Sequence, residues 1–498
     1  MQEHTDQGYL EAQSPWKGRN MQKTNQSRTI RAQADRTFTT QAESDHPLTL
    51  QMVTLMLPLI MGNILQQLYN TIDAAVIGHF AGQQDFAAVG VAGTVMNLFL
   101  FAIAGACTGI SILFAQLYGA GHIDRLRQEH FIALSTGLVF SVILACTGLL
   151  ANRPLLRLLQ TPEELLPCTH HYLSIILLAL PASFLYNLYS ALFRAVGKTS
   201  LPMLVLAFST VLNLFLDLLM VAVLGMGAGG AAIATSLAQL FSAGVCLLFL
   251  YRSTPFLCLQ RGDCRMDLPL LHKTLKLSFV TGFHQCALYL GKMMVQGAVN
   301  TGGTSLITAF TASARIEGFA NSFGDSGCAA TSILIAQSFG AGNKERIKKC
   351  FRVSLRLLAA VGIGMGLLMA VLASPLTVLI TGTADPAVLS QAVGYLRIIS
   401  AFYVFCFTGN TFAGYFDGIG HVAVPFAGAA SHITLRVILS WILISRFRLP
   451  AIAVATGLGW VWANTFWTLV RHRSEGGSKP RPISHLSVHS RRSALHIH

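Results

Sequence analysis

Two aspartates in otherwise apolar stretches are the first candidates for chemistry. Asp73 lies on one helix face with Gln66 and Tyr69, and Asp217 follows Asn213 by one helical turn. Neither aspartate has a Lys or Arg one turn away. A medium of low dielectric disfavours a carboxylate's charge unless a proton or a small cation neutralises it. The pattern predicts a group that exchanges a proton or binds a small cation, unless each aspartate simply bonds a neighbouring amide or faces a watery vestibule.

The composition indicates that lipid is the main solvent of the chain. Of its 498 residues, 53% are hydrophobic and 11% are charged, and the mean hydropathy is +0.56. Soluble globular proteins carry about 25% charged residues. The net charge of +14 fits the Lys and Arg that collect in cytoplasmic loops, and no basic patch interleaved with aromatic residues predicts nucleic-acid binding. The ten cysteines lack the spacing of a metal site.

The apolar segments predict twelve membrane-spanning helices, because each span needs about 20 residues. We expect them at 48–78, 86–118, 128–151, 170–197, 200–224, 229–251, 269–299, 305–338, 351–380, 388–417, 422–445 and 450–470. The predicted fold class is an all-α polytopic membrane protein. The polar segments 1–47 and 472–498 are predicted to be a disordered N-terminal extension and a disordered basic tail.

Basic residues in the loops predict the orientation. Sixteen Lys and Arg residues fall in one set of connecting segments and four in the other. Because basic residues favour the cytoplasmic side, both termini are predicted to be cytoplasmic, in a multi-pass protein of the cell (inner or plasma) membrane.

An internal repeat divides the spans into two halves. Ala115-Gln-Leu-Tyr-Gly-Ala-Gly121 returns as Ala336-Gln-Ser-Phe-Gly-Ala-Gly342, a shift of 221 residues, and Tyr172 pairs with Tyr395 at a shift of 223. Six spans per half is an even number, so both halves enter the membrane the same way up, about a pseudo-twofold axis along its normal. The predicted domains are an N-terminal lobe (48–252), a cytoplasmic linker (253–268) and a C-terminal lobe (269–471).

The second half carries a different set of intramembrane charges, namely Lys292, Arg315, Glu317, Asp325, Arg397 and Arg436. Arg436 falls where the repeat shift places a partner of Asn213, and Lys292 falls within two residues of the partner of Asp73. Arg315 and Glu317 can form an internal ion pair with no transport role. The acidic site is therefore predicted only in the first half.

These segments together resemble the multidrug and toxic compound extrusion (MATE) family over residues 48–470. The resemblance rests on Leu68-Tyr-Asn-Thr-Ile-Asp73 with Gly78, on the paired Ala-Gln-x-x-Gly-Ala-Gly segments, and on Phe193-Arg-Ala-Val-Gly-Lys-Thr199. Asn213-x-x-x-Asp217 and Gly230-Ala-Ala-Ile-Ala-Thr235 complete it.

The resemblance implies roles for particular residues, in the branch of the family whose first lobe holds the coupling ion. Asp73, Asn213, Asp217 and Thr235 match positions that bind a proton or sodium, and Pro58 matches a proline associated with bending of the first helix. Gln66 and Tyr69 match positions that line the substrate cavity, to which we also assign Asn187. In the other branch the acids lie in helices 7 and 10, where this chain has Leu288 and a position near His421, with Asp417 out of register.

The function implied is an antiporter that exports small cationic or amphipathic compounds in exchange for protons or sodium. It is expected to be a monomer in the lipid bilayer, with no cofactor, no metal other than the coupling ion and no nucleic-acid partner. An enzyme is not expected, because no nucleophile or metal constellation and no phosphate-binding loop is present. A lipid-linked oligosaccharide flippase of the same superfamily, which Arg315, Arg397 and Arg436 favour, a major facilitator type transporter and a channel remain alternatives.

Overall fold

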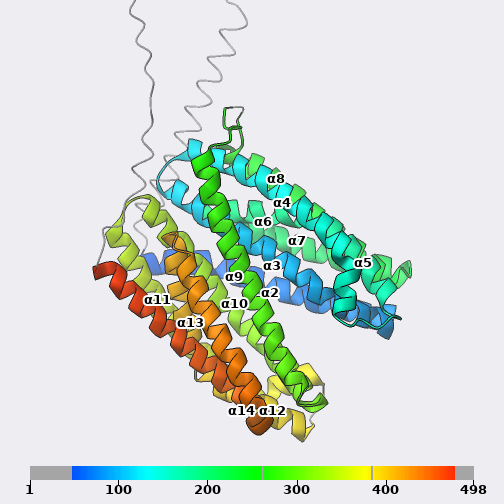
Figure 1. The fold of residues 1–498 in the computed structure, drawn as a ribbon. Coiled ribbons are helices and arrows are strands. Elements are labelled where there is room, and N and C mark those ends of the chain that lie inside the picture. The colour runs from blue at the N-terminus through cyan, green and yellow to red at the C-terminus, as the bar shows by residue number, and fades with distance from the viewer. Residues whose placement is uncertain (1–46, 261, 383–384, 477–498) are drawn as a thin grey trace, which may run out of the picture.

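The computed structural model describes residues 47–260, 262–382 and 385–476, which are almost entirely helical (Figure 1). The predicted extension lies outside the described residues except for Pro47. The predicted tail also lies outside them except for 472–476, which continue the last helix. The elements are α2 (Leu48–Val76), η1 (Ile77–Ala81), α3 (Gln83–Gly119), α4 (Ile123–Leu158), α5 (Leu166–Leu178), α6 (Leu180–Ala195), α7 (Ser200–Asp217), η2 (Leu218–Val223), α8 (Gly227–Ser253), η3 (Pro255–Leu257), α9 (Leu268–Asn300), α10 (Thr304–Gly340), α11 (Lys344–Thr381), α12 (Pro386–Ser400), α13 (Tyr403–Gly418) and α14 (Ala423–Gly476).

Each of the twelve predicted spans corresponds to one of these helices or to a bent pair. The pair α5 and α6 bends by 44°, and the pair α12 and α13 bends by 52°. α14 contains two spans, because its backbone leaves helical geometry at Arg448, whose φ is 53°. By length and composition, seven helices of the described chain are apolar enough to cross a membrane, or nine if each bent pair is one span. The twelve-span layout adds α9, α10 and the second part of α14.

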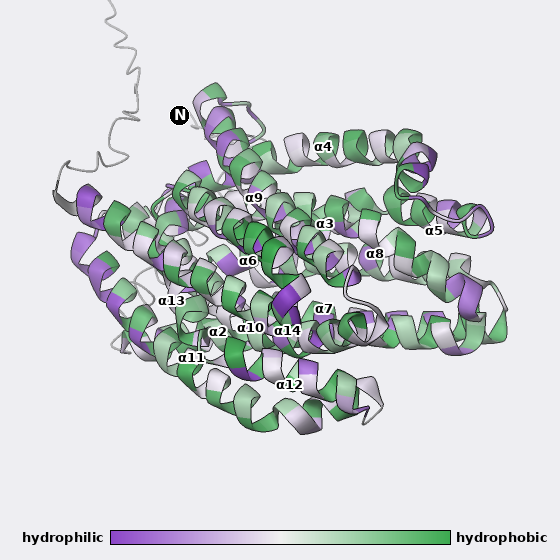
Figure 2. Ribbon diagram, turned by 60° about the horizontal axis from the view of Figure 1, so that its bottom comes forward, coloured by the Kyte–Doolittle hydropathy of each residue, from purple (hydrophilic) through white to green (hydrophobic). Residues whose placement is uncertain are grey.

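The helices turn large apolar side chains outward, as a lipid-facing protein must. Leu150 is 83% exposed, Leu158 78% and Leu379 77%. Figure 2 shows that hydrophobic residues dominate the lengths of the helices and that hydrophilic residues gather mostly towards their ends. In water such a surface would drive aggregation, whereas in a bilayer it contacts acyl chains at no cost.

The internal repeat is visible in the backbone itself. Gly82 and Gly303, which precede α3 and α10, have φ values of 90° and 88°. Gly121 and Gly342, in the turns that follow these helices, both have a φ of 70°. Only glycine adopts such positive φ angles without strain, so the duplicated glycines preserve the same entry and exit geometry in both halves.

Two helices join the halves along their length. α2 packs against α7 of its own half and also against α10 of the second half, and α9 packs against both α14 and α3. Figure 1 shows α9 running between the bundle of α3 to α8 and the bundle of α10 to α14. A side chain on α2 or α9 can therefore contact both lobes.

The Gly-Ala-Gly turns mark one end of the molecule, which we call the basic end because Arg125 and Lys344 lie beside these turns. Here α3 and α10 make their closest approach. A Cβ atom added at Gly119 would collide with the main chain of Gln337, and one added at Gly340 would collide with the main chain of Gln116. Glycine is required at both positions because backbone meets backbone.

Hydrogen bonds cross between the halves at the same place, and we call this set of contacts the seam. Gln116 Nε2 donates to the carbonyl oxygen of Gly418 at 3.0 Å, and Gln337 Nε2 donates to the carbonyl oxygen of Ala195 at 2.8 Å. Both donors follow the repeat shift of 221 and both acceptors follow the shift of 223. Lys273 Nζ also donates to Gln116 Oε1 at 3.1 Å. The seam closes the basic end between the lobes.

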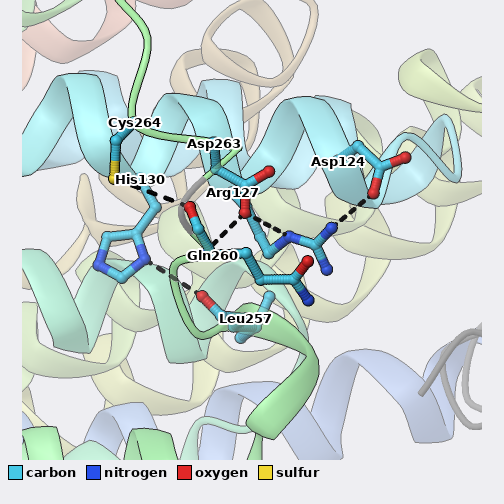
Figure 3. A network of polar contacts seen from close by, with 7 residues as sticks. All are labelled: Asp124, Arg127, His130, Leu257, Gln260, Asp263 and Cys264. Carbon is cyan, nitrogen blue, oxygen red and sulfur yellow. Dashed lines mark hydrogen bonds and ion pairs between the residues drawn. The ribbon is translucent and has the colours of Figure 1, made fainter. Parts of the chain in front are cut away.

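The linker between the halves is fastened to α4 (Figure 3). Arg127, whose side chain is 9% exposed, lies between two carboxylates: its Nη2 is 2.6 Å from Asp124 Oδ1 and its Nε is 2.9 Å from Asp263 Oδ2. His130 Nδ1 lies 3.2 Å from the carbonyl oxygen of Leu257. These contacts tie the chain that leaves α8 to the first lobe before α9 begins.

Candidate cation-binding site

The structure brings the two candidate aspartates together from different helices. Asp73 lies near the end of α2 and Asp217 is the last residue of α7. Their carboxyl groups are close enough to share a hydrogen bond when one of them is protonated. Asp217 is 0% exposed, and Asn213, one turn earlier on α7, is 2% exposed.

The backbone changes from α-helical to π-helical geometry within four residues after each aspartate. α2 passes into the π-helical turn η1 four residues after Asp73, and α7 passes into the π-helical turn η2 at the residue after Asp217. η1 and η2 also pack against each other. A π-helical turn shifts the helical register and occurs frequently at functional sites. The two turns set the direction in which both helices leave the carboxyl pair.

Tyrosine and threonine hydroxyl groups complete the surroundings of the pair. Tyr69 donates a hydrogen bond to Thr235 Oγ1 across 3.2 Å, which links α2 to α8. Tyr172, on α5 and 2% exposed, lies within electrostatic range of Asp73, Tyr69 and Asp217. Sequence reasoning did not assign Tyr172 to the site, although its repeat pairing with Tyr395 was a signal that this position is constrained.

Several atoms of the site have no hydrogen-bond partner among the described residues. They are Asp73 Oδ1, both carboxyl oxygens of Asp217, and Asn213 Nδ2. A buried polar atom without a partner costs free energy, and a charged one costs more. Two adjacent carboxylates of this kind require a proton or a cation between them. The arrangement can therefore hold one and release it.

The two amides among the predicted cavity residues, Gln66 and Asn187, lie on α2 and α6, and each bonds within its own helix. The Gln66 side chain is exposed, and its Nε2 lies 3.4 Å from Asn70 Oδ1 on the same helix. Asn187 Nδ2, on α6, donates to the carbonyl oxygen of Ser183 at 2.8 Å. In the described chain neither amide bonds to the carboxyl pair. Pro58 lies inside α2, which is helical on both sides of it.

The C-terminal half places its predicted charges in another arrangement. Lys292 lies on α9, Glu317 on α10 and Arg436 on α14. The ion pair considered between Arg315 and Glu317 does not form in the described structure. The reason is geometric, since residues two apart point to different sides of a helix.

Comparison with known proteins identifies the family of the chain. The family model MatE matches residues 58–219 and again residues 281–442, one match in each half. The second match begins 223 residues after the first, the shift that also relates Tyr172 to Tyr395. The family is thus found twice, as the repeat predicts.

Curated relatives extend the comparison over most of the described chain. A probable multidrug resistance protein, YpnP of Bacillus subtilis (strain 168), is 29% identical over 60% of this chain and 66% of its own length. A probable multidrug resistance protein NorM of Thermotoga maritima is 24% identical over 82% of this chain and 88% of the relative.

Solved structures share the fold. One, described as the outward-facing conformation of a multidrug resistance MATE family transporter of the MOP superfamily, superposes with a TM-score of 0.81 at 20% identity, over 87% of this chain and 98% of the other. Another, a MOP superfamily transporter from Pyrococcus furiosus, gives a TM-score of 0.81 at 20% identity, over 86% and 97% of the two chains. The paired family match rules out the alternative of a major facilitator type transporter, and the shared fold agrees with it. The chain belongs to the MatE family of multidrug efflux transporters.

Proposed function

We propose that the chain is an antiporter that exports small cationic or amphipathic compounds, and that the carboxyl pair Asp73 and Asp217 carries the coupling cation. The observation that carries this proposal is the pair itself: two carboxyl groups, from α2 and α7, within hydrogen-bond range of each other. Three of their oxygen atoms have no hydrogen-bond partner among the described residues. Intramembrane acids of this kind mark ion pathways.

The geometry favours a proton as the coupling ion. Two carboxyl groups at hydrogen-bond range are stable when one proton lies between them, and they titrate as a pair. Sodium would instead need several oxygen ligands in one shell, so the site would have to add other oxygen atoms, such as the hydroxyl groups of Tyr69 and Thr235, which bond each other. The proton therefore needs no atom beyond the pair.

Exchange follows from competition between the cation and the exported compound. A compound bound beside α2 interacts best with an ionised pair, whereas protonation removes that attraction. Each ligand shifts the equilibrium between two lobe arrangements only by its difference in affinity for them. The exposed side of α2 around Gln66 offers a polar surface next to the pair.

The experiment is transport by the purified chain in proteoliposomes with one gradient at a time. A pH gradient without sodium should drive uptake of a fluorescent cationic dye, and a sodium gradient at equal pH should not. Dye transport driven by sodium alone would move the proposal to sodium, and absence of transport under both gradients would refute antiport of such compounds.

A further inference from the structure

A carboxyl group is buried at the basic end of the molecule, apart from the carboxyl pair. Glu129 lies in the second turn of α4, close behind the first Gly-Ala-Gly turn, and it is 0% exposed. Asp73 and Asp217 lie instead where α2 and α7 approach the opposite end. No step of the proposed cation exchange uses Glu129.

The partner of Glu129 comes from the other half of the chain. Thr274, in the second turn of α9, is 2% exposed, and its Oγ1 lies 2.8 Å from Glu129 Oε1 and 2.8 Å from Glu129 Oε2. Because α4 belongs to the first half and α9 to the second, this buried contact joins the halves. It must break if the halves part at the basic end.

The residue before Thr274 connects this contact to the seam. Lys273 Nζ donates to Gln116 Oε1 at 3.1 Å, and Gln116 Nε2 donates across the seam to the carbonyl oxygen of Gly418 at 3.0 Å. Lys273 and Thr274 are neighbours on one helix. A movement that takes Thr274 away from Glu129 therefore also takes Lys273 away from the seam.

No cation pairs with Glu129 at close range. In the described structure no basic nitrogen lies within 4.0 Å of its carboxyl oxygens, and Lys273 acts on it from further away. Arg127 is held by two other carboxylates, and His130 faces a main-chain carbonyl. The other titratable side chains at this end of the helices packed against α4 do not act on it within the described chain; they are Tyr118 on α3, Tyr189 and Arg194 on α6, and His272 and Lys276 on α9. Burial without a close counter-ion favours a neutral, protonated carboxyl group.

The position of the Thr274 hydroxyl group also fits a protonated Glu129. Thr274 Oγ1 has one proton to donate, yet it lies near both carboxyl oxygens and 2.9 Å from the carbonyl oxygen of Leu270. A protonated Glu129 donates to Thr274 Oγ1, which leaves the threonine proton free for the carbonyl group. Every polar group of this chain of contacts then has a partner.

The repeat shows that the helices pack at this place without an acid. The matching contact in the second half joins α2 to α11, and Cys350 takes the place of Glu129 at the shift of 221. Met52 of α2 is 0% exposed, and its Sδ lies 3.6 Å from Ser354 Oγ, one turn beyond Cys350. Neutral side chains fill the matching space, so packing alone does not require Glu129.

We propose that Glu129 and the start of α9 form a proton-dependent latch, which holds the basic end closed while Glu129 is protonated. The latch opens when Glu129 gives its proton to water at that end. This inference rests on the proposed antiport function, because exchange requires the basic end to open. Parting of α4 and α9 lets water reach the carboxyl group, and water stabilises the ionised form. A high pH at the basic end therefore favours opening, and a low pH favours closure.

The test measures how readily the basic end opens at each pH, with the purified chain in nanodiscs, where both faces share one pH. Ala336 is 0% exposed and precedes the seam donor Gln337, so a cysteine placed there should react with a maleimide when the halves part. The labelling rate is divided by that of free cysteine at the same pH. Labelling of the chain without the added cysteine is subtracted.

Two variants probe the latch, and a third is the matched control. Glu129→Gln keeps a hydrogen-bond donor for Thr274 and removes the titrating group, whereas Thr274→Val removes the hydroxyl group. Glu345→Gln makes the same change of acid to amide at the start of α11, where the Glu345 side chain is 74% exposed.

We expect the corrected labelling rate of the wild type to rise about tenfold or more from about pH 5 to about pH 9, a range that covers buried glutamates. Glu129→Gln should label slowly at every pH, because its amide replaces the protonated carboxyl group. Thr274→Val should raise the rate at low pH about two- to tenfold, as the loss of one hydrogen bond predicts. Glu345→Gln should follow the wild type.

A wild-type rate that does not change with pH would overturn the latch, whether or not the variants fold. The same conclusion follows if Glu129→Gln keeps the wild-type profile, if Thr274→Val labels like the wild type at low pH, or if Glu345→Gln loses the pH dependence. Fast labelling of Glu129→Gln at low pH would also overturn it, and would make Glu129 an ionised structural partner of Lys273.

Dye uptake under a pH gradient, measured on the same preparation in proteoliposomes, tests the proposed function separately. Labelling needs neither the gradient nor the dye. Absence of uptake together with the expected labelling would refute antiport of the dye and support the latch. Uptake together with a labelling rate that does not depend on pH would support antiport and overturn the latch.

Discussion

Replacing Asp217 by asparagine should abolish gradient-driven transport and leave the fold intact. An amide has nearly the shape of a carboxyl group, but it cannot take up or release a proton. Asp217 is fully buried, and neither of its carboxyl oxygens has a hydrogen-bond partner among the described residues. The variant therefore removes a titrating group, and within the described chain it alters only the hydrogen bond that Asp217 can share with Asp73.

The variant should weaken binding of the coupling cation without lowering the stability of the fold. A hydrogen bond to a charged group is worth about 1.5–3 kcal/mol, so Asp73 alone should hold the coupling cation about one to two orders of magnitude more weakly than the pair does. The free energy of unfolding should not fall. An unpartnered buried polar group costs about 1–3 kcal/mol, and the new amide can donate to Asp73, so the melting temperature should stay equal or rise.

The assay is initial dye uptake into proteoliposomes under an imposed pH gradient, with the melting temperature measured on the same preparation. Asp417→Asn is the control, because Asp417 is a partly buried acid of the second half and should change uptake less than twofold. Dye uptake at the wild-type rate in both Asp217→Asn and Asp73→Asn would mean that the coupling ion binds elsewhere. Loss of uptake together with a lower melting temperature would mean that Asp217 is structural.

Three further predictions concern contacts elsewhere in the molecule. Gly119→Val should push α3 and α10 apart at the seam and lower the free energy of unfolding by about 1–3 kcal/mol through overpacking. Cysteines introduced at the basic end should then be labelled faster, and unchanged labelling would contradict the close approach of the two helices. Arg127→Ala should release the linker from α4, because Asp263 loses its ion-pair partner and keeps only the backbone N–H of Gln260. Proteolysis between α8 and α9 should then be faster, whereas equal digestion rates would show that other contacts hold the linker. Tyr69→Phe removes the hydrogen bond to Thr235, worth about 0.5–1.5 kcal/mol. Coupled transport should slow severalfold, and the melting temperature should fall only slightly. Transport at the wild-type rate would show that this bond has no part in the site.

The spans and the repeat could be predicted from the sequence because both depend on residues that are close together along the chain. Apolar length marks each helix, and the glycines of the two Gly-Ala-Gly turns mark positions where the backbone needs a positive φ. The break in α14 was predicted as the gap between two spans, at 446–449, and the structure places it at Arg448.

The site was harder to predict, because its members come from separate helices. Helical spacing put Asp73 with Tyr69 and Asp217 with Asn213, but it could not bring α2 next to α7. That proximity depends on packing of the whole first half, and only the family resemblance anticipated it. The turns η1 and η2 were not predicted, since η1 contains Gly78 and His79 whereas η2 is wholly apolar, and the two share no sequence pattern that distinguishes a π-helical turn from an α-helical one.

The seam has a consequence for the origin of the chain. In a symmetric dimer, each subunit offers the same patch, so that the donor of one meets the acceptor of the other and the reverse holds as well. The two glutamine contacts obey that rule, with Gln116 reaching Gly418 and Gln337 reaching Ala195. Two copies of a single six-helix unit could therefore have closed against each other before gene fusion joined them. The contact from Lys273 to Gln116 has no counterpart at Gln337 in the described structure. On this view it arose after the fusion, when the two copies could diverge.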